Sequence, residues 1–206
     1  MHELPNKDAA LKPVAEACLR NQQPIADALA PWLQAAGQWL ELGSGTGQHG
    51  VYIAERHPSV RWQLSDVADT LEGMRAWQQE AGLPNLPEPI VLDAADAVPP
   101  APVYDGVFTA NTLHFVGWEI AQAIITYASG SLKSGGTFAV YGPFNDNGRY
   151  TSDGNISLDK WLKSCDASSG IKDEQAIVDR AANCGLMLMS ATDMPANNRF
   201  IVFQKN

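Results

Sequence analysis

Short apolar runs alternate along the chain with stretches in which apolar residues recur at helical spacing. Five runs have the length of a strand and are bounded by glycine, proline or aspartate, at residues 38–42, 61–67, 89–93, 104–110 and 137–141. Two further runs, 186–192 and 199–203, are joined by the turn-forming segment MPANN without an intervening helix. The pattern predicts seven strands, of which the last two form a hairpin.

Helical patterns separate the strands. Asp173 is placed to cap the last helix, and Gly82 and Gly185 are placed to end two of them. The apolar faces are formed by Ile25, Leu29, Trp32 and Leu33, by Leu71, Met74, Gln78 and Ala81, by Ile120, Ile124, Tyr127 and Ala128, and by Ile177, Val178 and Ala181. Strands that alternate with helices indicate a mostly parallel sheet with helices on both faces. We predict an α/β protein with a doubly wound, seven-stranded sheet that is mostly parallel and has one antiparallel C-terminal strand.

The length of 206 residues is that of one domain. Hydrophobic residues make up 45% of the chain and charged residues 18%, a composition typical of a globular protein with an ordinary core. Residues 134–136 are expected to form a turn, and residues 144–155, the one candidate linker, a surface loop. We therefore predict a single domain over residues 1–206.

The chain carries 23 acidic and 14 basic residues, a formal charge of -9, which disfavours phosphate backbones and anionic lipid as ligands. We expect neither nucleic acid nor a membrane as partner. Cys18, Cys165 and Cys184 form no C-x-x-C pair, and the chain shows no signal-peptide pattern, so a cytoplasmic location is expected. No cluster of His, Cys, Asp and Glu has metal-ligand spacing, so no metal site is predicted.

A glycine cluster, ELGSGTG at residues 41–47, lies where the first strand should turn into a helix at Gln48. Glycine allows the tight turn and lets a ligand approach the main chain. Residues 45–50 match the dinucleotide pattern G-x-G-x-x-G, and Asp66 ends the second strand at the position from which a carboxylate holds ribose hydroxyls. These features favour an adenosine-bearing ligand without choosing between cofactors. A second interpretation of Asp66, as the cap of the next helix, stays open.

Three features weigh against a nicotinamide dinucleotide. Glu41 places a carboxylate before the first glycine, where it would repel a pyrophosphate but tolerate a cation. Asp93 ends the third strand and is a suitable acceptor for an amino group on adenine. No tyrosine is followed four residues later by a lysine, the pair that short-chain dehydrogenases use.

With these residues in place, the chain resembles a known family. ELGSGTG at 41–47, SD at 65–66, LDA at 92–94, YDGVFTAN at 104–111 and the final hairpin are similar to the ordered motifs of class I S-adenosylmethionine-dependent methyltransferases. RNQQPI at 20–25, YGPF at 141–144, TSDGN at 151–155, GIKDE at 170–174 and MPANN at 194–198 resemble a narrower family of small, functionally uncharacterised methyltransferase-like proteins. The resemblance implies a Rossmann-like sheet.

The resemblance also implies S-adenosyl-L-methionine as cofactor, with its methionine and ribose portions against the glycine turn. Asp66 would hold the ribose hydroxyls beside Val67, and Asp93 and the Ala94 amide would bind adenine. Asn111 would lie near the methionine end, and Glu41 would help orient the amino-acid group. The implied cofactor-binding residues are Glu41, Gly43, Ser44, Gly45, Gly47, Asp66, Val67, Asp93, Ala94 and Asn111.

Candidates for the acceptor side follow the fourth and fifth strands, because ligands of open α/β sheets bind at the carboxyl ends of strands. His114 and Tyr141 are the candidate catalytic residues, and Trp118 and Phe144 are candidate substrate contacts. By the resemblance, residues 1–36 form an N-terminal helical cover over a core of residues 37–206, and Arg20 or Asn21 reaches the cofactor carboxylate or the acceptor. Each of these residues also has an ordinary structural interpretation as a packing or surface residue.

These observations favour an S-adenosylmethionine-dependent methyltransferase that acts on a small molecule. The segment ANTLHF after the fourth strand lacks the Asn/Asp-Pro-Pro-Tyr/Phe motif of enzymes that methylate amino groups of adenine or glutamine. An NAD-dependent oxidoreductase and a non-enzymatic S-adenosylmethionine-binding protein remain the alternatives. A protein acceptor also stays open.

Overall fold

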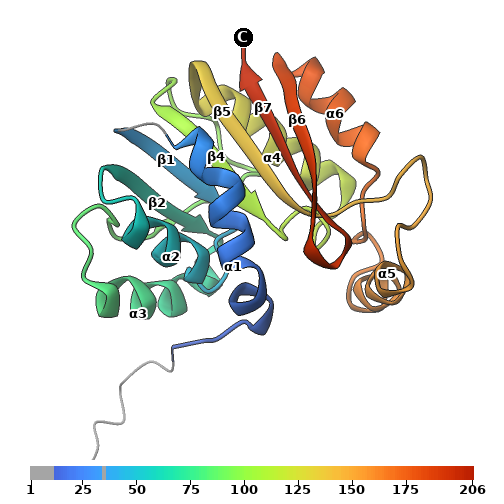
Figure 1. Cartoon of the computed structure of the whole chain (residues 1–206), viewed down its shortest axis with the longest axis horizontal. Helices are drawn as coiled ribbons and strands as arrows, with labels where there is room; N and C mark the ends of the chain where they lie inside the picture. The colour runs from blue at the N-terminus through green and yellow to red at the C-terminus, as the bar shows by residue number, and fades with distance from the viewer. Residues whose placement is uncertain (1–11, 34–35) are drawn as a thin grey trace, which may run out of the picture.

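The computed structural model describes residues 12–33 and 36–206 and has seven strands in one sheet (Figure 1). The strand order is β3-β2-β1-β4-β5-β7-β6. Their bounds are β1 Gly37–Leu42, β2 Val60–Asp66, β3 Ile90–Val91, β4 Tyr104–Ala110, β5 Leu132–Pro143, β6 Leu186–Met194 and β7 Asn198–Lys205. Strand β7 alone is antiparallel, because it pairs in the opposite direction with both β5 and β6. The predicted sheet is confirmed.

Helices cover both faces of this sheet. Their bounds are α1 Glu16–Leu29, α2 Gln48–Arg56, α3 Leu71–Ala81, α4 Trp118–Ser131, α5 Asp153–Cys165 and α6 Glu174–Asn183, with short 3₁₀ turns at Ala30–Trp32, Ala68–Thr70 and Pro195–Asn197. Buried residues of α1, α2 and α3 form one core cluster with the sheet, and those of α4 and α6 form another on the opposite face. Helix α5 lies beside the tip of the β6–β7 hairpin (Figure 1), where Asn155 donates to the Asn197 carbonyl.

Alternate residues of the central strands serve the two core clusters. Trp39 and Trp62 stack with ring centroids 5.7 Å apart on the face covered by α1, α2 and α3. Leu40 and Leu42 point to the other face and pack with α4. Parallel strands buried on both faces carry apolar residues at nearly every position, which is why the strand signals in the sequence are continuous apolar runs.

Two elements differ from the sequence expectations. Strand β5 begins at Leu132, so the expected turn at residues 134–136 is part of the strand, which pairs with β4 through a shift in register. Strand β3 is limited to Ile90–Val91, two exposed residues that pair only with the end of β2. A strand at the edge of the sheet has few partners and can be short.

Helix α5 is not predicted by the sequence pattern, and it begins at Asp153, within the expected loop at residues 144–155. Its N-cap is Ser152, whose side chain accepts from the Asn155 amide. Two of its buried residues are polar: Asn155, and Asp159, which is 2% exposed. The Asp159 carboxylate accepts from Tyr150 at 2.6 Å and from the Ile171 amide at 2.7 Å. Hydrogen bonds rather than an apolar stripe hold this helix, so periodicity does not reveal it.

No helix among residues 12–33 and 36–206 is both long enough and apolar enough to span a membrane.

Gly106 of β4 packs against the tryptophan stack, and this contact predicts how one added methyl group at Gly106 changes the stability of the protein. A Cβ on Gly106 would lie 2.2 Å from the Trp39 ring, whereas a Cβ on Gly154 in α5 would meet nothing closer than 3.6 Å. We expect Gly106→Ala to destabilise the protein by about 1–3 kcal/mol through overpacking. Gly154→Ala, the matched control, should be neutral or stabilising, because alanine is the better helix former. Urea unfolding measures both, and equal midpoints for Gly106→Ala and the parent protein would contradict the packing.

Candidate functional site

The turn between β1 and α2 exposes its main chain. Gly43, Gly45 and Gly47 all have a positive φ, +69°, +56° and +84°, in the left-handed region that favours glycine. Gly45 is exposed, and a Cβ there would have no atom within 4 Å, so the loop has open space against its backbone. Ser44 is buried, and its amide donates to the Ser65 carbonyl at 3.0 Å. The turn is therefore fixed by the hydrogen bond between Ser44 and Ser65 and has open space beside Gly45.

Asp66 links this turn to the carboxyl end of β2. Its Oδ2 accepts from the Gly45 amide and its Oδ1 from the Val67 amide, both at 2.7 Å. The 3₁₀ turn that follows begins after Val67 and receives no side-chain cap. The interpretation of Asp66 as a helix cap is therefore wrong, and its carboxylate faces the glycine turn.

A narrow cavity of about 80 Å³ lies at the carboxyl ends of β1, β2 and β3. Five of the residues that the resemblance implied for cofactor binding line it, namely Gly43, Asp66, Val67, Asp93 and Ala94. Its other lining residues, which the sequence reasoning missed, are Leu42, Leu92, Thr112, Val116, Ile120 and Ile124. The helical spacing of Ile120 and Ile124 predicts only that they belong to a packing face of the helix. Apolar side chains suit a flat ring, and two carboxylates suit its amino group and an attached diol, so the chemistry of the lining fits adenosine although the volume lies below that of whole small-molecule sites. We call this cavity the adenosine slot.

Glu41 does not face this slot. It is 1% exposed, and its Oε2 accepts from the Trp62 indole N–H at 2.8 Å beneath α2. Burial raises the pKa of Glu41 to about 8, an effect opposed by the Trp62 hydrogen bond and increased by the charge of Asp66. The expectation of a carboxylate at the strand tip is corrected: Gly50 in α2 leaves the space in which this side chain turns inward, since a Cβ there would lie 2.6 Å from Oε2.

A larger cavity of about 490 Å³ lies beside the segment that follows β4. Four residues predicted for the acceptor side line it, namely Arg20, Asn21, His114 and Tyr141, together with Asn111 from the predicted cofactor set. Its other lining residues are Ala17, Phe115, Pro143, Asn155, Leu158, Pro195, Ala196 and Asn198. Four of the five segments that resemble the narrower family, 20–25, 141–144, 151–155 and 194–198, thus meet at one cavity. We call it the acceptor cavity.

Two predicted substrate contacts do not reach the acceptor cavity. Phe144 is 3% exposed and belongs to the core cluster with α4 and α6. Trp118 is the first residue of α4 and lines neither cavity. Gly47, expected at the cofactor, is buried, and a Cβ there would lie 3.3 Å from Leu64 and Met74. Each of these positions is used for packing, which was the alternative interpretation of the two aromatic residues.

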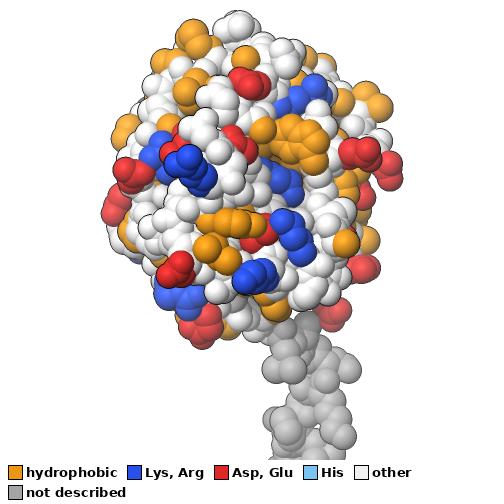
Figure 2. Space-filling model, turned by 90° about the vertical axis from the view of Figure 1, so that its right-hand side faces the viewer, with side chains coloured by type: hydrophobic (Ala, Val, Ile, Leu, Met, Phe, Trp, Pro, Cys, Tyr) orange, Lys and Arg blue, Asp and Glu red, His pale blue; other side chains and the backbone are white. Residues whose placement is uncertain are grey.

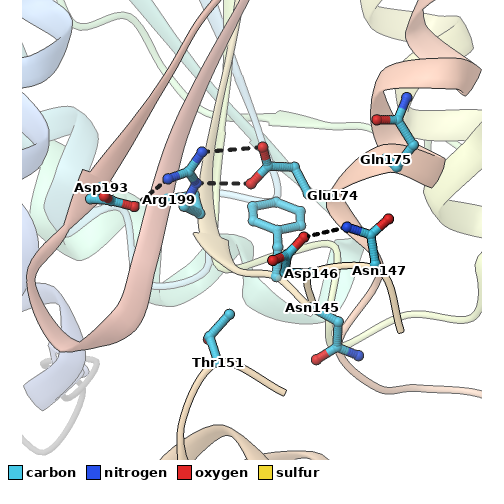
Figure 3. A pocket seen from close by; sticks show the side chains of 9 residues that line it. Asn145, Asp146, Asn147, Thr151, Glu174, Gln175, Asp193 and Arg199 are labelled. Carbon is cyan, nitrogen blue, oxygen red and sulfur yellow. Dashed lines mark hydrogen bonds and ion pairs between the residues drawn. The ribbon is translucent and has the colours of Figure 1, made fainter. Parts of the chain in front are cut away.

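Phe144 instead lines a separate polar hollow of about 320 Å³ at the start of β7 and α6, shown in Figure 3. In this view Arg199 is held by Glu174 and by Asp193, with its Nε 2.8 Å from Glu174 Oε2. The guanidinium is thus already paired with two carboxylates of the chain. This hollow shares none of the lining residues of the acceptor cavity.

Helix α1 is both part of the core and a wall of the acceptor cavity. Ile25 and Leu29 are fully buried, whereas Ala17, Arg20 and Asn21 line the cavity. A hydrogen bond of 2.8 Å joins Asn21 Oδ1 to Nε2 of His49 in α2. Residues 1–11 and 34–35 of the predicted N-terminal cover lie outside the described residues.

A second contact ties α1 to the glycine turn. Gln48 Oε1 accepts from the Ala15 amide at 2.6 Å and from Thr46 Oγ1 at 2.9 Å. Thr46 belongs to the glycine turn beside the adenosine slot, and Ala15 directly precedes α1, which lines the acceptor cavity. The Gln48 carboxamide therefore links the glycine turn to α1. Burial lowers the pKa of neighbouring His49 to about 4, so its imidazole is neutral where it meets Asn21.

His114 and Tyr141 differ in what they can do in the acceptor cavity. Burial, assisted by the charge of Lys172, lowers the pKa of His114 to about 4, so its imidazole is neutral and can accept a proton. Within the described ranges this imidazole makes no hydrogen bond and lies against the Phe115 ring, with centroids 4.6 Å apart. Burial raises the pKa of Tyr141, which therefore keeps its proton at neutral pH. No group of three or more His, Cys, Asp and Glu in this part of the chain could hold a metal ion.

The family comparison covers nearly the whole chain. A family model described as "Protein of unknown function (DUF938)" matches residues 12–205. The chain belongs to this family.

Three solved structures with the same fold are named as methyltransferases. An O-methyltransferase family protein from Burkholderia thailandensis is 20% identical with a TM-score of 0.76, over 93% of this chain and 58% of that one. An O-methyltransferase family 2 protein from Planctomyces limnophilus, in complex with apigenin, is 16% identical with a TM-score of 0.77, over 92% and 60%. Human N-acetylserotonin methyltransferase, in complex with S-adenosylmethionine, is 14% identical with a TM-score of 0.75, over 93% and 53%.

This chain thus spans little more than half the length of each of these proteins. The comparison shows a shared fold, the Rossmann-like fold of class I methyltransferases, and confirms the fold that the sequence motifs implied.

The buried carboxyl of Glu41 predicts how stability changes with pH. Its pKa is about 8 in the folded protein against 4.5 for an ordinary glutamate, so its contribution is fully present below pH 4.5 and is lost as pH rises towards 8. Glu41→Gln keeps an acceptor for Trp62 and cannot ionise. Between these pH values the variant should gain up to about 1.4 kcal/mol per pH unit over the parent protein in urea unfolding. Parallel stability profiles would show that Glu41 is ionised in the folded state.

Proposed function

We propose that this protein is an S-adenosylmethionine-dependent methyltransferase whose acceptor is a small molecule bound in the acceptor cavity. The observation that carries the proposal is the position of the segment after β4. Thr112 and Val116 line the adenosine slot, and Asn111, His114 and Phe115 line the acceptor cavity. One short segment therefore brings the two binding spaces together at the carboxyl edge of the sheet, where open α/β folds bind ligands.

The slot residues have the chemistry to hold the cofactor. Asp66 would accept from the ribose hydroxyls, Asp93 from the adenine amino group, and the apolar side chains of Leu92 and Ile124 would cover the ring. Asn111 has a left-handed φ of +57°, and its backbone N–H donates a hydrogen bond to the Tyr141 carbonyl. It would face the methionine end. When bound, S-adenosylmethionine would supply an electrophilic methyl group. The bond between the methyl group and the acceptor atom would form as the bond between the methyl group and sulfur breaks, and the electron pair would stay on sulfur.

The chain's own task is then to align the acceptor and to remove a proton. In-line displacement gains much of its rate from holding the reacting atoms in place, which the walls of the acceptor cavity would do. His114 would take the proton that a hydroxyl group loses as the oxygen–methyl bond forms, and would release it to solvent. Two of the structural neighbours are named as O-methyltransferase family proteins, which supports oxygen as the accepting atom.

The cysteines of the chain suit a reducing compartment. The three cysteines are free, and Cys165 is exposed. Free thiols are typical of proteins from the cytoplasm, which is the location we propose.

Cofactor binding can be measured with S-adenosylhomocysteine by calorimetry. Asp66→Ala should weaken binding about ten- to a hundred-fold, because the ribose hydroxyls lose a charged acceptor and the Gly45 amide loses its partner. Gly45→Val should also weaken binding, since a side chain would occupy the open space above the turn. Asp69→Asn, an exposed change nearby, is the control.

The cofactor alternatives are separated by the same titration. A folded sample that gives no heat with S-adenosylhomocysteine but changes the fluorescence of NADH would replace the methyltransferase by an oxidoreductase.

The role of His114 can be tested by turnover, measured as accumulation of S-adenosylhomocysteine with a metabolite library. His114→Gln should lower turnover about 10²- to 10⁴-fold, the usual contribution of general base catalysis, and leave cofactor affinity unchanged. His57→Gln is the control. Because the neutral imidazole is the active form, turnover should fall as pH is lowered through about 4 and stay level above it. Cofactor binding without turnover of any compound would favour the non-enzymatic binding protein.

A further inference from the structure

We propose that the acceptor is a compact molecule with an apolar body and one anionic group, and that Arg20 recognises this group. The proposal rests on the proposed methyltransferase function and narrows the class of its substrate. Arg20 is the one charged residue among those that line the acceptor cavity, and none of the lining residues is an aspartate or glutamate.

The charge of the cavity differs from that of the chain. The protein has 23 acidic and 14 basic residues, and Figure 2 shows Lys, Arg, Asp and Glu side chains mixed over one face of its surface. The acceptor cavity, in contrast, has a cation and no carboxylate among its lining residues. His114 adds no charge at neutral pH, because burial lowers its pKa to about 4. Arg20 is therefore the charged residue nearest to a ligand inside the cavity. The effect of charges farther away is reduced because salt screens them.

Two asparagines of the cavity already use their amide nitrogens within the protein. The Asn155 amide nitrogen donates to Thr151 Oγ1 at 2.8 Å, and the Asn198 amide nitrogen donates to the Pro195 carbonyl at 3.0 Å. Their carbonyl oxygens are the groups left for a ligand, and an oxygen accepts from a hydroxyl but repels an anion. Neutral donors are left on Asn21, Asn111 and Tyr141, so Arg20 is the one charged donor that the lining residues offer an anion.

Arg20 and His114 differ in exposure within the cavity. Arg20 is exposed on α1, whereas His114 is 6% exposed behind the carboxyl end of β4. A bound molecule with its anion on Arg20 would direct its other end towards His114, with its body against apolar side chains such as Leu158 and Pro143. The volume of about 490 Å³ lies in the range of small-molecule sites. The acceptor hydroxyl is thus expected near His114 and the anion near Arg20.

Arg20 is placed to form such an ion pair. Within residues 12–33 and 36–206 it makes no ion pair with a carboxylate, unlike Arg199 in the polar hollow. The main chain that carries it is held by buried Ile25 and Leu29 and by the bond between Asn21 and His49. A guanidinium on a fixed helix can bind a carboxylate or a related anion through two parallel hydrogen bonds.

The test uses matched anionic and neutral probes. The ortho, meta and para isomers of hydroxybenzoate and the corresponding hydroxybenzamides are titrated by calorimetry into the full-length protein saturated with S-adenosylhomocysteine. At least one carboxylate should bind about ten-fold more tightly than its amide. Arg20→Gln should remove this preference, and Arg20→Lys should keep part of it. Arg61→Gln, an exposed change on β2 outside both cavities, should have no effect.

Four results would overturn the proposal: equal affinity for carboxylate and amide, no binding of any probe, a preference that survives in Arg20→Gln, or weaker binding of S-adenosylhomocysteine to that variant. The last result would assign Arg20 to the carboxylate of the cofactor. The same probe titrations without S-adenosylhomocysteine measure the anion preference of the cavity by itself. Failure of cofactor binding in the parent protein is therefore distinguished from failure of recognition by Arg20.

Discussion

The hydrogen bond from the Gly45 amide to Asp66, 2.7 Å long, joins the two parts of the structure on which the functional site depends. It connects the turn after β1 to the end of β2, and it keeps the turn open because the carboxylate holds it from the side. Ser65 reinforces the join from below, where its hydroxyl donates to the Glu41 carbonyl at 2.6 Å. These strand ends form one side of the adenosine slot, and its remaining walls come from the segments that follow β3 and β4 and from α4.

The acceptor cavity depends on elements that are distant in the sequence. The insertion of antiparallel β7 between β5 and β6 brings the hairpin tip at Pro195 and Asn198 next to the end of β5. Helix α5 closes this side through Asn155, and α1 closes the opposite side through Arg20 and Asn21. The carboxamide of Gln48 then links α1 to the glycine turn, so the walls of the two binding spaces are mechanically connected.

Burial changes the chemistry of three groups at the site. Glu41 retains its proton beneath α2, whereas His49 and His114 lose theirs. In each case the charged form would have to exist away from water, which is costly without a strong partner. The negative charge beside the adenosine slot therefore comes from Asp66 and Asp93, and the positive charge of the acceptor cavity comes from Arg20.

The sequence by itself determined the α/β class, the seven strands, the antiparallel C-terminal strand and, through the family resemblance, five of the residues that line the adenosine slot. These features follow from local rules: apolar runs, glycines at a tight turn, and strand ends that meet at one edge of a parallel sheet. Only the tertiary structure decided that Glu41 turns inward, that Phe144 belongs to the core, and that α5 exists on buried hydrogen bonds. Side-chain direction and burial depend on partners far along the chain, and spacing in the sequence does not encode those partners.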